Sequence, residues 1–167
     1  DARGKLERWQ RIVLYLAGPG AGFLFFGFVL GLDHLVIRQH LHVARWNPYM
    51  VALFRALYFM NLFVNLMNLL PIFPLDGGQV TREICTFASP RKGTAICLGI
   101  GFALGLAVAL YSLAVLAQWR SGGEIWLPYP PMDPLFVVIQ FGMLAIQNYQ
   151  MLQLERARDD DNYYERW

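Results

Sequence analysis

Long apolar segments separated by short polar ones make up most of this chain. Four of them, residues 12–32, 50–73, 93–119 and 134–154, are long enough to cross a bilayer, since a hydrocarbon core about 30 Å thick needs roughly 20 apolar residues in a helix. Three contain no Asp, Glu, Lys or Arg, and the second contains only Arg55, near its start. The pattern predicts an all-α, polytopic membrane protein with about four transmembrane helices in a single transmembrane domain, residues 1–167.

The composition supports this class and excludes others. Of 167 residues, 56% are hydrophobic and only 16% are charged, whereas soluble domains contain about 25% charged residues. The net charge of +2 provides no basic surface of the kind that binds nucleic acid. We therefore expect the lipid bilayer, and no nucleic acid, as a partner.

The Lys and Arg residues are divided unequally between the connections, which predicts the orientation. Ten lie in the N-terminal segment, the second connection and the C-terminal tail, and three lie in the first and third connections. Cytoplasmic connections of membrane proteins carry the excess of Lys and Arg. We expect an integral, multi-pass protein with both ends of this segment in the cytoplasm.

Glycines four residues apart recur within the apolar segments. Such pairs allow two helices to approach closely in lipid, although glycine is also frequent in membrane helices in general. The pairs are Gly18 and Gly22, Gly27 and Gly31, and Gly101 and Gly105. Close helix packing is therefore one of two interpretations for each pair.

Three asparagines recur along one face of the second apolar segment. Asn61, Asn65 and Asn68 are spaced by four and three residues, so on a helix they lie within a narrow arc. An amide that faces lipid has no hydrogen-bond partner, so this face must contact protein or a water-filled cavity. Two interpretations are open, namely hydrogen bonds to a neighbouring helix and the lining of a functional cavity.

The end of the second apolar segment does not suit a regular helix. Pro71 and Pro74 each lack a backbone donor and clash with the preceding turn, and Gly77 and Gly78 allow close approaches that other residues do not. We therefore expect the second transmembrane helix to be broken here, with Asp76 at the cytoplasmic edge of the membrane. An ionisable residue at such a break indicates a functional site, although Pro-x-Asp-Gly is also typical of a simple turn.

These residues resemble a known family. The eleven-residue pattern Asn68-x-x-Pro71-x-x-Pro74-Leu75-Asp76-Gly77-Gly78 is similar to the second signature of the site-2 protease family, the intramembrane zinc metalloproteases. The resemblance implies that Asp76 is the third zinc ligand and that Asn68 helps to bind the substrate or the developing oxyanion. A second segment, residues 16–22, is similar to the Ala-Gly-Pro element of that family, although many relatives have asparagine where this chain has Gly22. The resemblance covers roughly residues 10–82.

The resemblance implies zinc-dependent intramembrane proteolysis, the hydrolysis of a peptide bond in or near a transmembrane helix of a substrate protein. Two imidazoles and Asp76 would hold Zn²⁺ and leave a fourth position for water. The face of Asn61, Asn65 and Asn68 would line the cavity and offer hydrogen bonds to an unwound substrate strand. The expected partner besides the bilayer is a transmembrane protein or peptide substrate.

The family's first signature, His-Glu-x-x-His, is absent from this chain. That signature supplies two zinc ligands and the general base. The three histidines, His34, His40 and His42, lie in the first connection, across the membrane from Asp76 by the charge distribution. We therefore expect this chain to be the C-terminal portion of a longer protease, inactive by itself.

Three alternatives to a protease stay open. One is a non-catalytic relative that has lost the first signature. Another is a transport module whose broken helix forms an ion or solute site. The third is a scaffold that binds membrane helices without cutting them.

Overall fold

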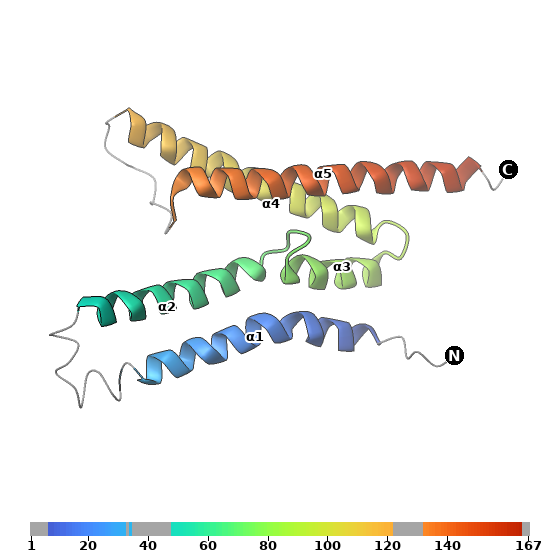
Figure 1. Cartoon of the computed structure of the whole chain (residues 1–167). Coiled ribbons are helices and arrows are strands. Elements are labelled where there is room, and N and C mark those ends of the chain that lie inside the picture. Colours follow the sequence, from blue (N-terminus) through green and yellow to red (C-terminus); the bar gives the residue numbers. More distant parts are fainter. Residues whose placement is uncertain (1–6, 33, 35–47, 122–131, 165–167) are drawn as a thin grey trace. The chain divides into compact units, whose positions relative to one another are not determined.

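The computed structural model describes residues 7–32, 34, 48–121 and 132–164. They form five helices and no strand within these ranges (Figure 1), which confirms the all-α class. In chain order the helices are α1 (Arg8–Leu32), α2 (Pro48–Asn68), α3 (Asp76–Ala88), α4 (Gly93–Arg120) and α5 (Pro134–Tyr164).

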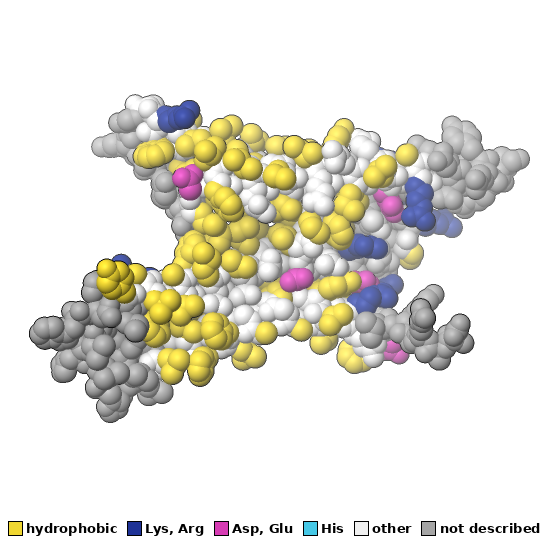
Figure 2. Space-filling view, in the orientation of Figure 1, with side chains coloured by type: hydrophobic (Ala, Val, Ile, Leu, Met, Phe, Trp, Pro, Cys, Tyr) yellow, Lys and Arg dark blue, Asp and Glu magenta, His cyan; other side chains and the backbone are white. Residues whose placement is uncertain are grey.

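Three of the expected spans fall on helices that are long and apolar enough to cross a membrane. These helical stretches are Arg8–Leu32, Gly93–Arg120 and Pro134–Arg158, and only 11% to 33% of the most apolar window of each is buried. Figure 2 shows the hydrophobic side chains spread along the outer surface of the helices. Such a surface suits contact with lipid better than contact with water. The remaining expected span, residues 50–73, is the second in chain order and corresponds to α2, and its crossing of the membrane stays a prediction.

The helix count differs from the prediction because the second connection contains α3. The expected break after α2 is present, since the helix ends at Asn68 and a new one starts at Asp76. We expected irregular backbone around Asp76, but this residue is the first of a regular helix of 13 residues. This helix has both polar and apolar residues and is too short to span a membrane, so a search for long apolar segments did not identify it.

The chain groups into two compact units. The first unit comprises Asp1–Leu70 with Leu75–Val80, and the second comprises Pro71–Pro74 with Thr81–Trp167. Within the first unit, α1 and α2 pack against each other and run in opposite directions (Figure 1). The rings of Phe26 and Tyr58 meet edge to face there, with centroids 5.9 Å apart.

In the second unit, α4 and α5 pack along each other through small residues. An added Cβ at Gly105 would lie 3.2 Å from the Cβ of Ala145, and one at Gly101 would lie 2.5 Å from Asn148 Oδ1. Gly101 and Gly105 are therefore close-packing positions, as one of the two interpretations predicted. By contrast, no described atom lies within 4 Å of a Cβ added at Gly27 or Gly31, so packing does not explain that pair in the part of the chain described.

The starts of α4 and α5 are determined by different features, since the residue before α4, Lys92, makes no side-chain capping bond. Gly93 is required where α3 turns into α4, because a Cβ there would lie 2.5 Å from the Cys85 backbone. At the start of α5, the Asp133 carboxylate accepts a hydrogen bond of 2.8 Å from Leu135 N, and Pro134 occupies the first helical position, where its missing N–H costs nothing. These features fix where the two long helices begin.

Candidate functional site

The helix break between α2 and α3 is the centre of the candidate site. The last turn of α2 tightens, because Leu69 N bonds Leu66 O at 3.2 Å and Leu70 N bonds Met67 O at 3.0 Å. Pro71 follows, and it cannot donate the next backbone hydrogen bond. A residue before proline also disfavours the helical region, so the sequence ends the helix where the structure does.

Asp76 lies at the N-terminus of α3, where the backbone N–H groups produce a partial positive charge. Its side chain is half-buried. Oδ2 lies 3.4 Å from the position of a Cβ added at Gly18 of α1, and both residues belong to the first unit. The Asp76 motif and the Ala-Gly-Pro segment, which are almost 60 residues apart in sequence, therefore lie side by side.

Gly77 is required by the tightness of the turn. A Cβ added here would overlap the Leu69 carbonyl group and lie 2.7 Å from Leu70 O. Gly77 and Gly78 are both buried. Backbone therefore packs directly on backbone next to Asp76, which restricts the positions that the first turn of α3 can adopt.

The three asparagines on one face of α2 make different contacts. Asn61 Nδ2 donates to Leu57 O at 2.9 Å, and Asn65 Nδ2 donates to the backbone oxygen of Asn61. Asn65 is buried, and its amide occupies the space that a side chain at Gly22 would fill. Asn68 is half-buried. Asn65 and Asp76 thus contact successive turns of α1, and Gly18 and Gly22 provide the space, so this glycine pair is also a close-packing position.

Pro71–Pro74 belong to the second unit. Ile72 is completely buried, with its Cα 3.4 Å from a Cβ added at Gly101. The Phe73 carbonyl accepts a hydrogen bond of 2.6 Å from Asn148 Nδ2, and Asn148 has no exposed surface. The Phe73–Pro74 peptide bond is cis. Sequence analysis did not identify Asn148, although an amide within an apolar helix does indicate a buried partner.

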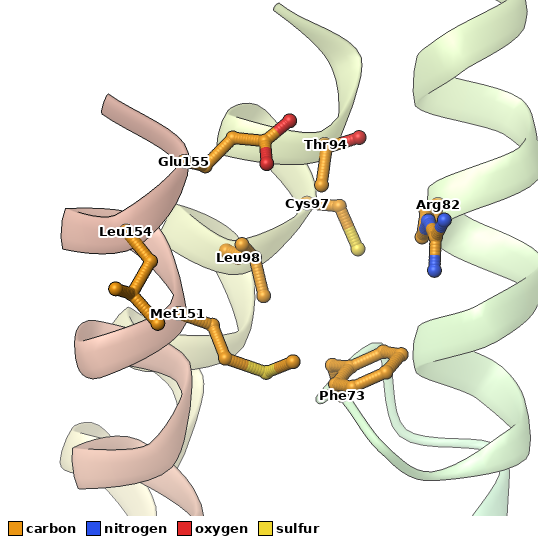
Figure 3. A pocket seen from close by; sticks show the side chains of 8 residues that line it. All are labelled: Phe73, Arg82, Thr94, Cys97, Leu98, Met151, Leu154 and Glu155. Atoms are coloured by element: carbon orange, nitrogen blue, oxygen red, sulfur yellow. The ribbon is translucent and has the colours of Figure 1, made fainter. Parts of the chain in front are cut away.

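A cavity of about 220 Å³ lies within the second unit (Figure 3). Arg82, Thr94 and Glu155 contribute polar groups, and the remaining lining is apolar apart from a thiol. The Phe73 ring and the Arg82 guanidinium lie opposite the side chains of α4 and α5 in this view (Figure 3). The full lining consists of Phe73, Arg82, Thr94, Cys97, Leu98, Met151, Leu154 and Glu155.

The described residues do not by themselves fit a zinc site. A catalytic zinc needs three protein ligands, and no group of three His, Cys, Asp or Glu side chains that could hold a metal occurs within residues 7–32, 34, 48–121 and 132–164. Asp76 offers one carboxylate. His34 is exposed, and His40 and His42 lie outside the described residues. Any zinc bound through Asp76 therefore requires ligands from elsewhere.

Comparison with known proteins gives a family match that includes the helix break between α2 and α3. Residues 31–108 match the model of peptidase family M50. The chain is 30% identical over 110 residues to zinc metalloprotease MJ0392 of Methanocaldococcus jannaschii. It is 33% identical over 111 residues to sll0528 of Synechocystis sp. and 40% identical over 74 residues to Rip3 of Mycobacterium tuberculosis, both also named as zinc metalloproteases.

These alignments cover 65%, 65% and 41% of this chain, but 30%, 27% and 18% of the relatives. The chain therefore spans less than a third of the length of the curated relatives it matches. No solved structure matches it.

Proposed function

We propose, from its match to peptidase family M50, the site-2 protease family, that the chain takes part in zinc-dependent cleavage of a peptide bond in or near a transmembrane helix. Its relatives are named as zinc metalloproteases. The substrate in this proposal is a transmembrane protein or peptide that reaches the site through the bilayer. The chain supplies one part of the catalytic site, and the remaining zinc ligands come from outside the described residues.

One observation carries this proposal, the placement of Asp76 against Gly18. A ligand carboxylate needs a fixed position and an open approach on one side. The tight turn at Gly77 and the contact with Gly18 support the first condition, and the incomplete burial of the Asp76 side chain supports the second. We propose Asp76 as the carboxylate ligand, and bound zinc would supply an activated water and polarise the scissile carbonyl.

Asn68 is the residue that we propose for substrate binding. Its amide ends α2 eight residues before Asp76, and within the described part of the chain no side-chain hydrogen bond occupies it. An amide offers two donors and an acceptor, which suits the backbone of an unwound substrate strand. Asn61 and Asn65 donate to backbone carbonyls of α2, so their proposed part is to shape the wall of the cavity.

The proposed orientation follows from the charges. Arg82 lies in α3, and Arg91 and Lys92 lie in the turn before α4. The second connection and the two chain ends carry more Lys and Arg than the first and third connections. This excess favours a cytoplasmic position for α3 and for both chain ends. Asp76 is then close to the cytoplasmic surface of the membrane.

The test compares Asp76→Asn with Glu83→Gln in the full-length natural protein. Both variants exchange a carboxylate for an amide in α3, but Glu83 lies seven residues beyond Asp76, about 10 Å along the helix. We expect Asp76→Asn to abolish cleavage of a transmembrane substrate in liposomes and to lower the zinc content, because an amide is a weaker zinc ligand than a carboxylate. Glu83→Gln should retain both.

Two results would contradict the proposal. Full zinc content and activity in Asp76→Asn would exclude its role as a ligand. A wild-type full-length protein that neither binds zinc nor cleaves would instead identify a non-catalytic member of the family.

A further inference from the structure

Among the described residues of the second unit, Asn148 of α5 is the most completely buried polar side chain. It has no exposed surface, although α5 carries a stretch apolar enough to cross a membrane. Burying an amide is costly unless it is hydrogen-bonded, so its partners indicate why it is there. Nδ2 donates to two carbonyls, to Leu144 O of its own helix at 2.7 Å and to Phe73 O at 2.6 Å.

The two bonds have different consequences. The bond to Leu144 is local, between residues four apart, and an amide on a helix forms such a bond without help from the rest of the fold. The bond to Phe73 joins residues 75 positions apart in sequence. Phe73 lies in the turn between α2 and α3, three residues before Asp76, so Asn148 holds the backbone that leads into the proposed ligand.

Gly101 of α4 leaves space for the contact between Asn148 and Phe73. A Cβ added at Gly101 of α4 would lie 2.5 Å from Asn148 Oδ1 and 3.4 Å from the Cα of Ile72, and contacts below 3.0 Å force a neighbour to move. Oδ1 has no hydrogen-bond partner among the described residues, and it points toward the Gly101 backbone instead. Ile72, the residue before Phe73, is completely buried. One glycine therefore accommodates both the amide and the turn that it holds.

We propose that Asn148 is a positioning residue for the protease reaction, which acts by anchoring the Pro71–Pro74 turn through Phe73 O and thereby fixing the approach of the chain to Asp76. This inference rests on the proposed function, since it assigns Asn148 a role only if Asp76 is a ligand. In this role Asn148 acts through the Phe73 backbone. Groups that orient metal ligands affect metal affinity or activity by about ten- to a hundredfold.

The experiment uses the full-length natural protein and two independent ways to disturb the anchor. Asn148→Ala removes the donor, and Gly101→Ala displaces the amide without changing it. The matched controls are Gln147→Ala, an exposed amide one position earlier, and Gly99→Ala, whose added Cβ meets no described atom within 4 Å. Melting in detergent shows which variants fold, and all rates are taken per folded molecule.

We expect both disturbing variants to lower kcat about ten- to a hundredfold with little change in KM, because the substrate cavity is intact but the proposed ligand is displaced. Amide hydrogen exchange of residues 69–78 should become at least about tenfold faster. Gly101→Ala should add less than about twofold in the Asn148→Ala background, because both changes remove the same interaction. The two control variants should match the wild type.

The outcomes separate this inference from the proposed function. Faster exchange with unchanged kcat would overturn the positioning role, and unchanged exchange would overturn the anchoring itself. A fully additive effect of Gly101→Ala would show that it acts through something other than Asn148. If Asp76→Asn keeps zinc and activity, the ligand role fails and this inference fails with it, and the exchange data then show whether the anchor exists independently.

Discussion

Substitution of Gly77 by alanine is the sharpest test of the turn geometry. It adds a single methyl group, and the atoms that this group would clash with belong to the backbone. In Gly77→Ala the new Cβ would lie 2.7 Å from Leu70 O, whereas ordinary contact begins at 3.4 Å. The Leu70 carbonyl must therefore move by about 0.7 Å, the difference between 3.4 and 2.7, and the Leu69 carbonyl, which the Cβ would overlap, must move further. A rotamer change cannot relieve this contact.

The free-energy cost follows from two opposing terms. Overpacking of this kind costs about 1–3 kcal/mol, and two displaced carbonyl groups favour the upper end of that range. Alanine is better than glycine within a helix by up to about 1 kcal/mol, which offsets part of the cost. The net destabilisation is about 2 kcal/mol, or roughly a 30-fold change in the ratio of folded to unfolded protein. If the fold accommodates the added methyl group instead, residue 77 and its neighbour Asp76 are displaced. A displacement of about 1 Å at a reacting group can lower the catalytic rate about a hundredfold.

The assay pairs melting in detergent with cleavage of a transmembrane substrate per folded molecule, in the full-length natural protein. Gly20→Ala is the control, because it adds the same methyl group to a helix of the same unit and meets no described atom within 4 Å. We expect Gly77→Ala to melt lower or to cleave at least tenfold more slowly, and Gly20→Ala to match the wild type. Wild-type melting and cleavage in Gly77→Ala would refute the backbone contact.

Two further predictions concern the other contacts of the first unit. Asn68→Ala should lower turnover more than folding, because its amide makes no described hydrogen bond within the protein; loss of expression with unchanged specific activity would instead indicate a structural role. Gly22→Val should lower the melting temperature, since its side chain would displace the buried amide of Asn65, whereas Gly27→Val, in open space on the same helix, should not. Equal melting of the two variants would contradict the packing of Asn65 on α1.

The sequence predicted those features that depend on local composition. Helix α4 starts at residue 93, where the third apolar segment was expected to begin, and α2 ends just before Pro71 because proline removes a donor. Helix α3 was missed, since its 13 residues are neither long nor uniformly apolar. A short helix of this kind depends on its tertiary surroundings more than on its own pattern.

The contacts of the candidate site could be predicted only in part. The spacing of Gly18 and Gly22 indicated close packing, but nothing in it showed that Asp76 and Asn65 are the neighbours. The residues that share one face of a helix can be recognised from their spacing in the sequence. Which two helix faces pack together depends on the fold as a whole. For the same reason, the bond from Asn148 to Phe73, between residues 75 positions apart, has no signature in a single sequence.

The chain passes from the first unit to the second, back to the first and again to the second. This path limits where the protein can be joined to a relative in a chimera. Four residues, Pro71–Pro74, group with the second unit, while the residues on either side of them group with the first. No single crossover point in this region can therefore exchange one unit intact, since a junction after Leu70 would also replace Leu75–Val80, including Asp76. Chimeras between relatives should therefore keep the whole stretch from α2 to α3 from one parent.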